Sequence, residues 1–430
     1  MEAMRVWVND KPVGWIAPHN GTGCTFVYDR DVDPSDAVSL TMPVRVASYD
    51  QSSGLLPVFD TNLPEGVLLD RIRNVLAKMS GKRASDYEVL SCTGANQIGR
   101  IRILPEGQEP VRRPPVDNIE DILDRDATAQ MKAEIFDRYA LNSGVSGSSP
   151  KVLMEAFDPD QSERRVTLQT RDYILKFSSD DFPGLSLCEF HCLEAARLGG
   201  NDTVEARLSR DGRSLAIRRF DEIDGRRLGF EDFASLNAQT ADMKYLGSVE
   251  SSLFKTASAF AGKHDKPLLE KLYRQVVTNV ALRNGDAHLK NFGVLFDDAA
   301  KGELQLTPAY DIVTTRAWMR EDMYALLIAG SKRFPKYDGL VRLCTRAKIA
   351  PLRAREIISE VAEGIRRQLP VMVADLDARG EGALARKIAE EWNDGLVKSL
   401  NSAAVPVPEL RDVAARVIDA DVEDDFEPGL

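Results

Sequence analysis

The residues best suited to chemistry in this sequence lie in the segment NGDAHLKN at positions 284–291. Asp286 and Asn291 have the Asp-x-x-x-x-Asn spacing of a phosphoryl-transfer catalytic loop. Such a reaction needs a carboxylate that accepts the proton of the attacking hydroxyl and an oxygen ligand for a phosphate-bridging Mg²⁺. The spacing alone also fits a polar loop with a helix cap, but Gly285 and His288 favour the catalytic interpretation. We therefore predict Asp286 as the base and Asn291 as a metal ligand.

Two further charged residues sit where the same chemistry needs them. Asp311 follows an apolar stretch in LTPAYDIV, the place of the principal Mg²⁺ carboxylate, although a lone Asp there could also be a turn residue. Lys176 lies among apolar strand residues in YILKF. In kinases, the lysine that holds the α- and β-phosphates lies in a strand of this kind. Glu189 on the next predicted helix is its obvious partner. An edge-strand lysine that prevents aggregation is the alternative for Lys176.

The segment SGVSGSSPK at 143–151 is rich in small residues. Small residues let backbone N–H groups approach phosphate oxygens, and Lys151 adds a positive charge. The segment is not a Walker A loop, and by itself it fits a flexible connection equally well. The order of the motifs favours a phosphate loop. The segment precedes the strand lysine, the helix glutamate, the catalytic loop and the metal aspartate, and a kinase fold needs this order.

The elements that must position these residues divide the chain into three parts. Residues 1–110 read as a β-rich subdomain with short strands near 6–8, 13–16, 24–28, 38–42 and 94–104 and a helix over 63–81. Residues 111–230 begin with a Pro-rich linker and continue as helix, strand, strand, helix, strand. Residues 231–430 are nearly all helical. We predict an α+β fold, two-lobed and protein-kinase-like, with a β-rich N-terminal subdomain and a mostly helical C-terminal lobe.

Composition excludes several other classes of protein. The 430 residues carry a net charge of −11, which disfavours a general nucleic-acid binder because phosphate binding needs concentrated positive charge. No apolar run is long enough for a membrane span, and no signal peptide is evident, so we predict a cytoplasmic protein. The five cysteines are scattered, which favours reduced thiols. Cys188, His191 and Cys192 could hint at a metal site, but buried small residues on a helix are the better interpretation.

The chain resembles the HipA family of bacterial serine/threonine kinases, the toxins of toxin–antitoxin pairs. The N-terminal segments VWVNDKPVGWI, SLTMP and FDTNLPEGVLLDRI are similar to that family's β-rich subdomain, and VSGSSPKVLM is similar to its phosphate loop. The kinase core is matched by YILKF, EFHCLEAARLG, AIRRFD, FEDFASLN, NGDAHLKNFGVLF and LTPAYDIV.

The resemblance implies ATP and Mg²⁺ as cofactors and a protein Ser or Thr as the acceptor. It further implies an aminoacyl-tRNA synthetase as the target, whose phosphorylation would stop translation and promote dormancy or tolerance. The implied partner is a helix-turn-helix antitoxin of the HipB type, which would also provide most of the contact with operator DNA.

Site roles carry over by motif. Asp286 would be the base, Lys176 would hold the phosphates, and Asn291 and Asp311 would bind Mg²⁺. The remaining predicted nucleotide contacts are the phosphate loop, the hinge and the residues beside the catalytic and metal loops: Ser146, Gly147, Ser148, Ser149, Pro150, Lys151, Arg218, Arg219, Phe220, His288, Leu289, Lys290 and Tyr310.

The chain departs from the family pattern at two positions. Arg218 stands where members often carry an acidic hinge residue, and Gly144 stands where members carry the serine that becomes autophosphorylated. If autophosphorylation occurs here, Ser146 and then Ser143 are the expected sites. Two other functions are compatible with the motifs: a small-molecule phosphotransferase of the aminoglycoside- or lipid-kinase type, and a non-catalytic co-repressor subunit.

Overall fold

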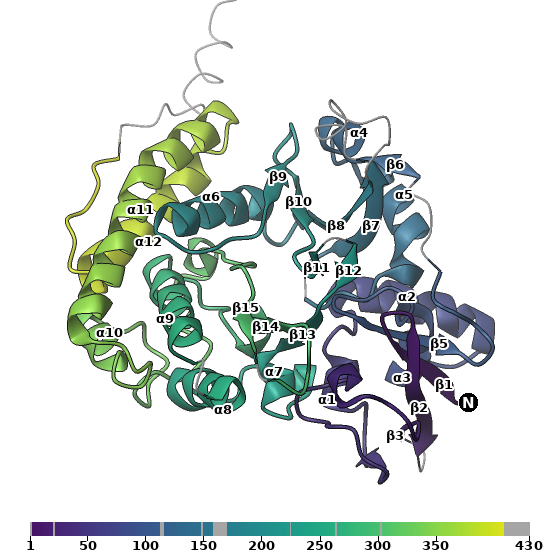
Figure 1. Cartoon of the computed structure of the whole chain (residues 1–430). Helices are drawn as coiled ribbons and strands as arrows, with labels where there is room; N and C mark the ends of the chain where they lie inside the picture. Colours follow the sequence, from purple (N-terminus) through teal and green to yellow (C-terminus); the bar gives the residue numbers. More distant parts are fainter. Residues whose placement is uncertain are drawn as a thin grey trace, which may run out of the picture.

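A computed structural model describes residues 2–19, 22–111, 116–147, 149–157, 170–223, 225–262, 265–301 and 303–407. Ser148 of the predicted phosphate loop lies outside these residues. Figure 1 shows a helical lobe on one side and two β-sheets with their helices on the other. The predicted two-lobed α+β class is confirmed.

An antiparallel sheet in the order β4-β3-β2-β1-β5 forms the N-terminal subdomain. Met4, Val6 and Val8 alternate inward along β1 and form the core with Ile16 and Phe26. Helices cover this core, and Gly81, in the left-handed conformation, ends α2 as predicted. The elements are β1 Met4–Val8, β2 Lys11–His19, β3 Gly23–Tyr28, β4 Tyr49–Gln51, α1 Pro57–Asp60, α2 Gly66–Ser80, α3 Asp86–Thr93 and β5 Ile101–Pro105.

The prediction of a strand at 38–42 is wrong. This segment makes only an isolated bridge between Ser39 and Met42. Its polar groups instead bind the buried carboxylate of Glu231 in the neighbouring lobe, which accepts from the Leu40 backbone N–H at 2.6 Å and from Ser39 Oγ at 3.0 Å. The segment therefore fastens the N-terminal subdomain to the rest of the molecule.

A second sheet has the order β6-β7-β8-β10-β9 and carries the predicted strand lysine. Its sequence of strand, strand, helix, strand matches the prediction, with the short β9 added. Lys151 at the start of β7 pairs in register with Lys176 on β8. The elements are β6 Asp117–Asn118, α4 Ile119–Asp124, α5 Ala129–Tyr139, β7 Lys151–Phe157, β8 Thr170–Phe177, α6 Leu185–Leu198, β9 Ala206–Leu208 and β10 Ser214–Arg218.

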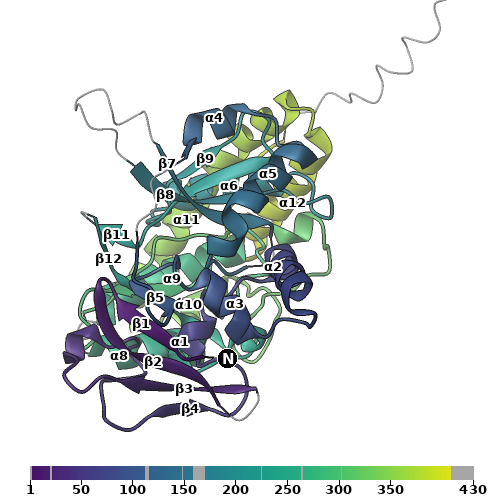
Figure 2. The same cartoon turned by 90° about the vertical axis from the view of Figure 1, so that its right-hand side faces the viewer.

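The last part of the chain is mainly helical, as predicted, and also holds the small sheet β13-β14-β15. α6 packs along α11, so the helix that carries Glu189 is anchored on this lobe (Figures 1 and 2). No helix of the described part is long and apolar enough to cross a membrane. The elements are β11 Glu222–Ile223, β12 Arg226–Arg227, β13 Gly229–Asp232, α7 Phe233–Leu236, α8 Thr256–Ala261, α9 Asp265–Ala281, β14 Gly293–Phe296, β15 Gln305–Leu306, α10 Tyr337–Leu343, α11 Pro351–Ala378 and α12 Gly382–Lys398.

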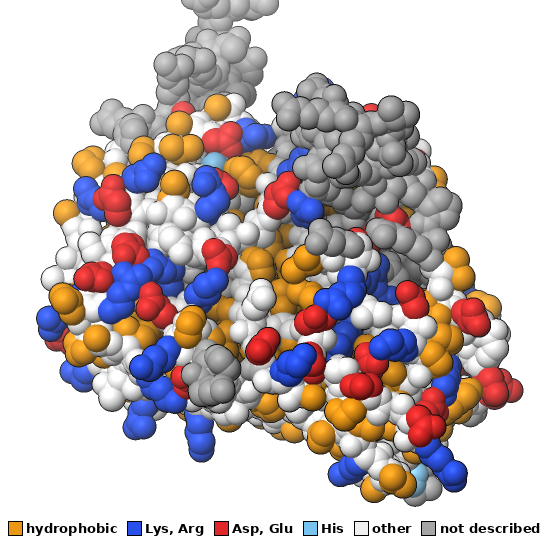
Figure 3. Space-filling view, viewed as in Figure 1, with side chains coloured by type: hydrophobic (Ala, Val, Ile, Leu, Met, Phe, Trp, Pro, Cys, Tyr) orange, Lys and Arg blue, Asp and Glu red, His pale blue; other side chains and the backbone are white. Residues whose placement is uncertain are grey.

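On the face seen in Figure 3, acidic and basic side chains are interspersed over most of the surface. Hydrophobic side chains gather toward the hollow between the lobes. The predicted site residues come from elements on both sides of this hollow.

Candidate active site

A buried charge cluster joins the two lobes. Lys176 Nζ on β8 donates to Glu189 Oε1 on α6 at 2.6 Å and to Asp311 Oδ1 at 2.7 Å. Burial opposes the charge on Lys176, but the two carboxylates outweigh it and raise its pKa. Burial also opposes the charge on Asp311, yet Lys176 and Lys151 keep the pKa of that carboxyl below its usual value. Lys176 and Asp311 are therefore both ionised at neutral pH.

Asn291 lies against the second oxygen of Asp311. Its Nδ2 donates to Asp311 Oδ2 at 3.0 Å, while its Oδ1 accepts from the His288 backbone N–H at 3.0 Å. An ionised carboxylate beside an amide oxygen is a donor set that suits Mg²⁺. Because the amide nitrogen faces Asp311, Asn291 must turn its amide over to present the oxygen to a cation held there. Asp311 itself has a φ of 57°, a strained left-handed conformation for a residue other than glycine.

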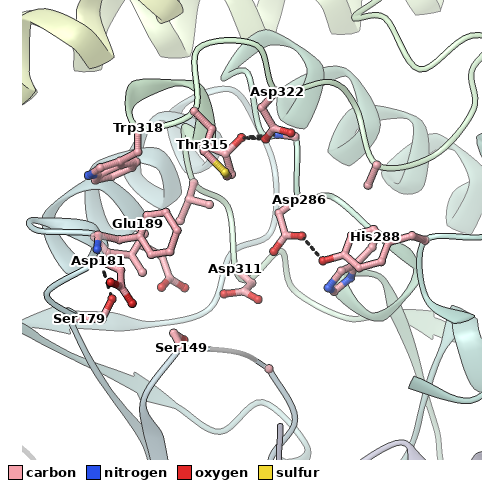
Figure 4. A pocket seen from close by; sticks show the side chains of 18 of the residues that line it. Ser149, Ser179, Asp181, Glu189, Asp286, His288, Asp311, Thr315, Trp318 and Asp322 are labelled. Carbon is pink, nitrogen blue, oxygen red and sulfur yellow. Dashed lines mark hydrogen bonds between the residues drawn. The ribbon is translucent and has the colours of Figure 1, made fainter. Parts of the chain in front are cut away.

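Asp286 is held next to these groups in a separate environment (Figure 4). Its Oδ1 accepts a hydrogen bond from the Tyr245 hydroxyl at 2.7 Å. Burial raises the pKa of Asp286 to about 6, against a lowering effect of the Tyr245 contact. Burial also lowers the pKa of the neighbouring His288 to about 3, so this imidazole is neutral at pH 7. Asp286 is thus ionised above pH 6 yet basic enough to accept a proton.

The loop that carries Asp286 is fixed from both sides. The Asn284 side chain accepts from the Asp286 N–H at 3.1 Å and donates to Asn279 Oδ1 at 2.7 Å. Thr315 Oγ1 accepts from the Gly285 N–H at 2.8 Å and donates to Asp322 at 2.5 Å. A Cβ on Gly285 would lie 1.9 Å from Asp322 Oδ2, so only glycine lets the 315–323 segment pack this closely.

A narrow pocket of about 80 Å³ lies between the lobes beside this cluster. Phe220 and Tyr310 line it and stack on each other, with ring centroids 5.4 Å apart and planes within 12°. Its other apolar lining residues come from the N-terminal subdomain, the phosphate loop and the sheets. These are Ile98, Val145, Ile174, Ile217 and Phe230. Aromatic and aliphatic walls that lead to Lys176 and Asp311 are suited to a purine base with its phosphates.

The phosphate loop closes over this pocket through a few side-chain contacts. Ser146 Oγ hydrogen-bonds Glu65 of the N-terminal subdomain, and Lys244 Nζ pairs with the same carboxylate at 2.5 Å. Lys151 Nζ donates to the Ser146 backbone oxygen at 3.3 Å. Burial lowers the pKa of Lys151, whose positive charge faces Asp311. Glu65, from the first 110 residues, thus holds the Ser146 hydroxyl.

Ser143 and Gly144 belong to the core beneath the loop. Ser143 is fully buried; its Oγ donates to the Tyr139 carbonyl at 2.8 Å and accepts from the Leu153 N–H at 2.8 Å. Gly144 forms a bridge with Gln97, and a Cβ there would lie 2.5 Å from Gln97 Cγ and 2.8 Å from the Asn96 oxygen. This close packing explains why the position is glycine here.

Most predicted nucleotide contacts line the narrow pocket, but several do not. Arg219 is buried away from it, where it pairs with Asp221 at 2.6 Å and donates to the Gln97 carbonyl at 2.7 Å. Arg218 points outward to Glu205 at 3.0 Å. Leu289 is a core residue, and Ser149 and Pro150 line the adjoining larger cavity instead. Lys290 reaches the pocket but is committed to Asp232. The residues of the predicted set that line the narrow pocket are Ser146, Gly147, Lys151, Lys176, Phe220, His288, Lys290, Asn291, Tyr310 and Asp311.

The cysteine pair lies below this site. Cys188 and Cys192 are buried with their sulfurs 3.9 Å apart, while His191 turns to Asp375 and Gln368. No cluster of three metal-ligating side chains of the His, Cys, Asp and Glu type occurs in the described ranges. The interpretation as core residues of a helix fits this arrangement.

Sequence reasoning missed three contributors. Tyr245 holds Asp286, Glu65 holds Ser146, and Thr315 holds Gly285. Thr315 lies four residues after Asp311 and could have been suspected from that proximity. Tyr245 and Glu65 carry no motif signal, because tertiary packing alone brings them to the site.

Two family profiles match this chain, one in each of two separate ranges. A profile of the HipA-like C-terminal domain matches residues 143–369, more than half of the chain. A profile of the HipA N-terminal domain matches residues 4–104. The chain belongs to the HipA family. The resemblance found in its motifs is thereby confirmed, and the matched ranges include every residue of the charge cluster.

Two proteins of Sinorhizobium fredii (strain NBRC 101917 / NGR234) that are kinases by name, Y4mE and Y4dM, are similar to this HipA-family chain. Y4mE is 26% identical over 342 residues, which cover 74% of this chain and 78% of the relative. Y4dM is 26% identical over 333 residues, with 72% and 75% covered. Among solved structures, HipA of Shewanella oneidensis MR-1, in complex with HipB and operator DNA, superposes with a TM-score of 0.63 at 16% identity. That match covers 93% of this chain and 98% of the other, and it shows a shared fold.

Proposed function

We propose that this chain is an ATP- and Mg²⁺-dependent serine/threonine protein kinase and the toxin of a toxin–antitoxin pair. The observation that carries the proposal is the convergence of Lys176, Asp286, Asn291 and Asp311 between the lobes. The family membership and the two kinase-named relatives support the same activity.

The residues divide the work of the reaction. Asp286 accepts the proton of the acceptor hydroxyl through the oxygen that Tyr245 leaves free. Lys176, held between Glu189 and Asp311, and the buried Lys151 supply positive charge for the phosphates. Asp311 and Asn291 are the residues that would hold Mg²⁺, which when bound neutralises phosphate charge. Because His288 is neutral, its imidazole adds no positive charge beside the base.

Autophosphorylation, if it follows the family, centres on Ser146. Ser146 lines the nucleotide pocket and its hydroxyl contacts Glu65, whereas Ser143 has both hydrogen bonds committed in the core. A phosphate adds about −1.5 to −2 of charge, which next to Glu65 and bound ATP would expel the loop and switch off the kinase. Phosphopeptide mapping should find phosphate on Ser146 and lose it in Ser146→Ala.

The target and partners rest on the family resemblance. An aminoacyl-tRNA synthetase is the proposed acceptor, and a HipB-like helix-turn-helix protein is the proposed antitoxin and the main contact with operator DNA. The solved Shewanella complex of HipA, HipB and operator DNA supports that partnership. Phosphoproteomics of cells that express wild type or Asp286→Asn would identify the target.

The decisive experiment removes the base. In Asp286→Asn, transfer of the ATP γ-phosphate to protein should fall about 10²–10⁴-fold, because a general base contributes that much. The matched control is Asp297→Asn, which changes a half-exposed carboxylate paired with Arg226 on the surface. Undiminished labelling in Asp286→Asn, with ATP binding intact, would contradict the assignment.

A further inference from the structure

A second, larger cavity opens on the other side of the catalytic residues. It holds about 670 Å³ and shares Gly147, Lys151, His288 and Asp311 with the nucleotide pocket. Asp286 lines this cavity and not the narrow one. Figure 4 shows Asp286 and Asp311 on one wall, with Trp318 and Asp181 across from them. The acceptor hydroxyl must therefore reach Asp286 through this cavity.

Across the cavity from Asp286 lies an aromatic pair. Phe182 and Trp318 pack edge to face with ring centroids 6.1 Å apart at 85°, and Leu185 and Val313 are further apolar residues of the lining. Trp318 Nε1 donates to the Pro183 carbonyl at 3.2 Å, so the indole's polar group is already satisfied. The surface left for an occupant is the ring system, which favours an apolar side chain.

The mouth of the cavity is also apolar, although it faces solvent. Val67, Tyr245, Met319 and Met323 line it with exposed fractions of 53%, 42%, 46% and 51%. Exposed apolar side chains are unremarkable singly, but a group of them around one opening marks an interaction site. Flexible methionines adapt to the surface of a protein partner.

Charge at the rim indicates what kind of partner fits. Besides Glu189, Asp286 and Asp311, the acidic side chains Asp181, Glu321 and Asp322 line the cavity, against the basic residues Lys151 and Lys332. This excess of acid repels a nucleic-acid backbone and attracts a cationic side chain.

We infer that this cavity docks an extended protein segment that carries an apolar side chain near its acceptor hydroxyl and a Lys or Arg beyond it. The apolar side chain packs on Phe182 and Trp318, the cation pairs with Asp181 and Glu321, and the hydroxyl meets Asp286. This inference rests on the proposed kinase function and adds the chemistry of the acceptor.

The test uses the full chain with ATP, Mg²⁺ and a peptide library that has a central Ser or Thr and randomised flanks. The wild type should select an apolar residue at one flanking position and Lys or Arg over Asp and Glu at another. In the double variant Met319→Ser/Met323→Ser, kcat/KM for the best peptide should fall about 10-fold, with the KM for ATP within about two-fold of wild type. The matched control is Leu352→Ser/Val371→Ser, which changes two exposed apolar residues of α11 at 68% and 55% exposure and should leave both constants unchanged.

A charge-reversal variant tests the proposed pairing with a cationic side chain of the acceptor segment. Glu321→Lys should shift the library preference from Lys and Arg toward Asp and Glu. Equal flanking preferences in wild type and both pocket variants would overturn the inference, as would a wild type that labels itself but no peptide. If neither wild-type chain nor peptide is labelled, or if Asp286→Asn labels as well as wild type, the proposed function itself fails.

Discussion

The catalytic loop and the phosphate loop bracket the same site but are held in different ways. The catalytic loop is tied mainly by neighbours in its own part of the chain, since Asn279, Asn284 and Thr315 all bond within it. It also contacts the N-terminal subdomain, through Lys290 Nζ, which donates to the Thr61 carbonyl at 2.7 Å. The phosphate loop is held by the N-terminal subdomain: the Gly144 N–H donates to the Asn96 carbonyl at 2.9 Å, and the Ser146 hydroxyl is held by Glu65. The catalytic loop is thus fixed mainly within its own lobe, whereas the Ser146 part of the phosphate loop is held by a side-chain contact that a single added charge can break.

This difference corresponds to two functions, proton transfer and nucleotide entry. Proton transfer needs Asp286 within hydrogen-bond reach of its substrate, which favours a fixed loop. In the proposed kinase, ATP entry needs access to a pocket of about 80 Å³ that Ser146 and Gly147 help to enclose. We therefore expect changes on the catalytic side to act on kcat and changes on the phosphate side to act mainly on the KM for ATP.

The largest expected effect tests that division at two charged residues. Asp311→Asn removes a partner of Lys176 and the carboxylate of the Mg²⁺ site, so kcat should fall at least about 10²–10³-fold. Lys151→Met removes the charge behind the phosphate loop and should cost about 10-fold, mainly in the KM for ATP, since a hydrogen bond to a charged group contributes on the order of 1.5 kcal/mol. Steady-state kinetics with both variants measure the split.

Mg²⁺ titration provides the control. The Lys151→Met variant should keep the wild-type Mg²⁺ dependence, whereas Asp311→Asn should need far more Mg²⁺ or show no response to it. A loss of kcat in Lys151→Met equal to that in Asp311→Asn would mean that the two regions do not differ as described.

The same division explains how far the sequence could be interpreted. Asp286, Asn291 and Asp311 could be located because their spacing reflects one local loop and the strand pair that follows it. The hinge arginines could not, because whether Arg219 faces the nucleotide or the N-terminal subdomain depends on Gln97, far away in the chain. The segment 38–42 was predicted as a strand for its apolar residues, while the Glu231 carboxylate that holds it lies in another lobe. Local order was predictable, and contacts between lobes were not.

The next largest effect is expected from alanine substitutions of two glycines, one in each loop. Gly285→Ala would press on Asp322 at 1.9 Å and on the Met323 carbonyl at 2.8 Å, and Gly144→Ala would press on Gln97 and the Asn96 carbonyl. Each should cost about 1–3 kcal/mol in thermal or denaturant unfolding, as overpacking does.

Their kinetics should differ despite similar losses of stability. Gly285→Ala should lower kcat because it moves the loop of Asp286, whereas Gly144→Ala should raise the KM for ATP. Gly107→Ala is the control, because a Cβ there meets nothing within 4 Å, although its φ of 80° adds some backbone strain. Identical kinetic defects in the two site variants would erase the distinction between fixed and releasable loops.

The smallest expected effect concerns the hydrogen bond that Tyr245 donates to the base. Two backbone hydrogen bonds fix the segment that carries Tyr245. The Leu289 N–H donates to the Lys244 carbonyl at 3.1 Å, and the Leu327 N–H donates to the Gly247 carbonyl at 3.1 Å. Burial raises the pKa of Asp286 to about 6, and the Tyr245 hydrogen bond works against that rise. Since only the ionised base accepts a proton, kcat/KM should fall tenfold per pH unit below about 6. Tyr245→Phe removes the hydrogen bond, so the pKa rises further and the acidic limb moves to higher pH. The loss should be several-fold at pH 6 and should nearly vanish at pH 8, where Asp286 is ionised in both wild type and variant.

A loss of equal size at both pH values would mean that Tyr245 positions the loop without changing the pKa of Asp286, and the catalytic side would then be fixed by geometry alone.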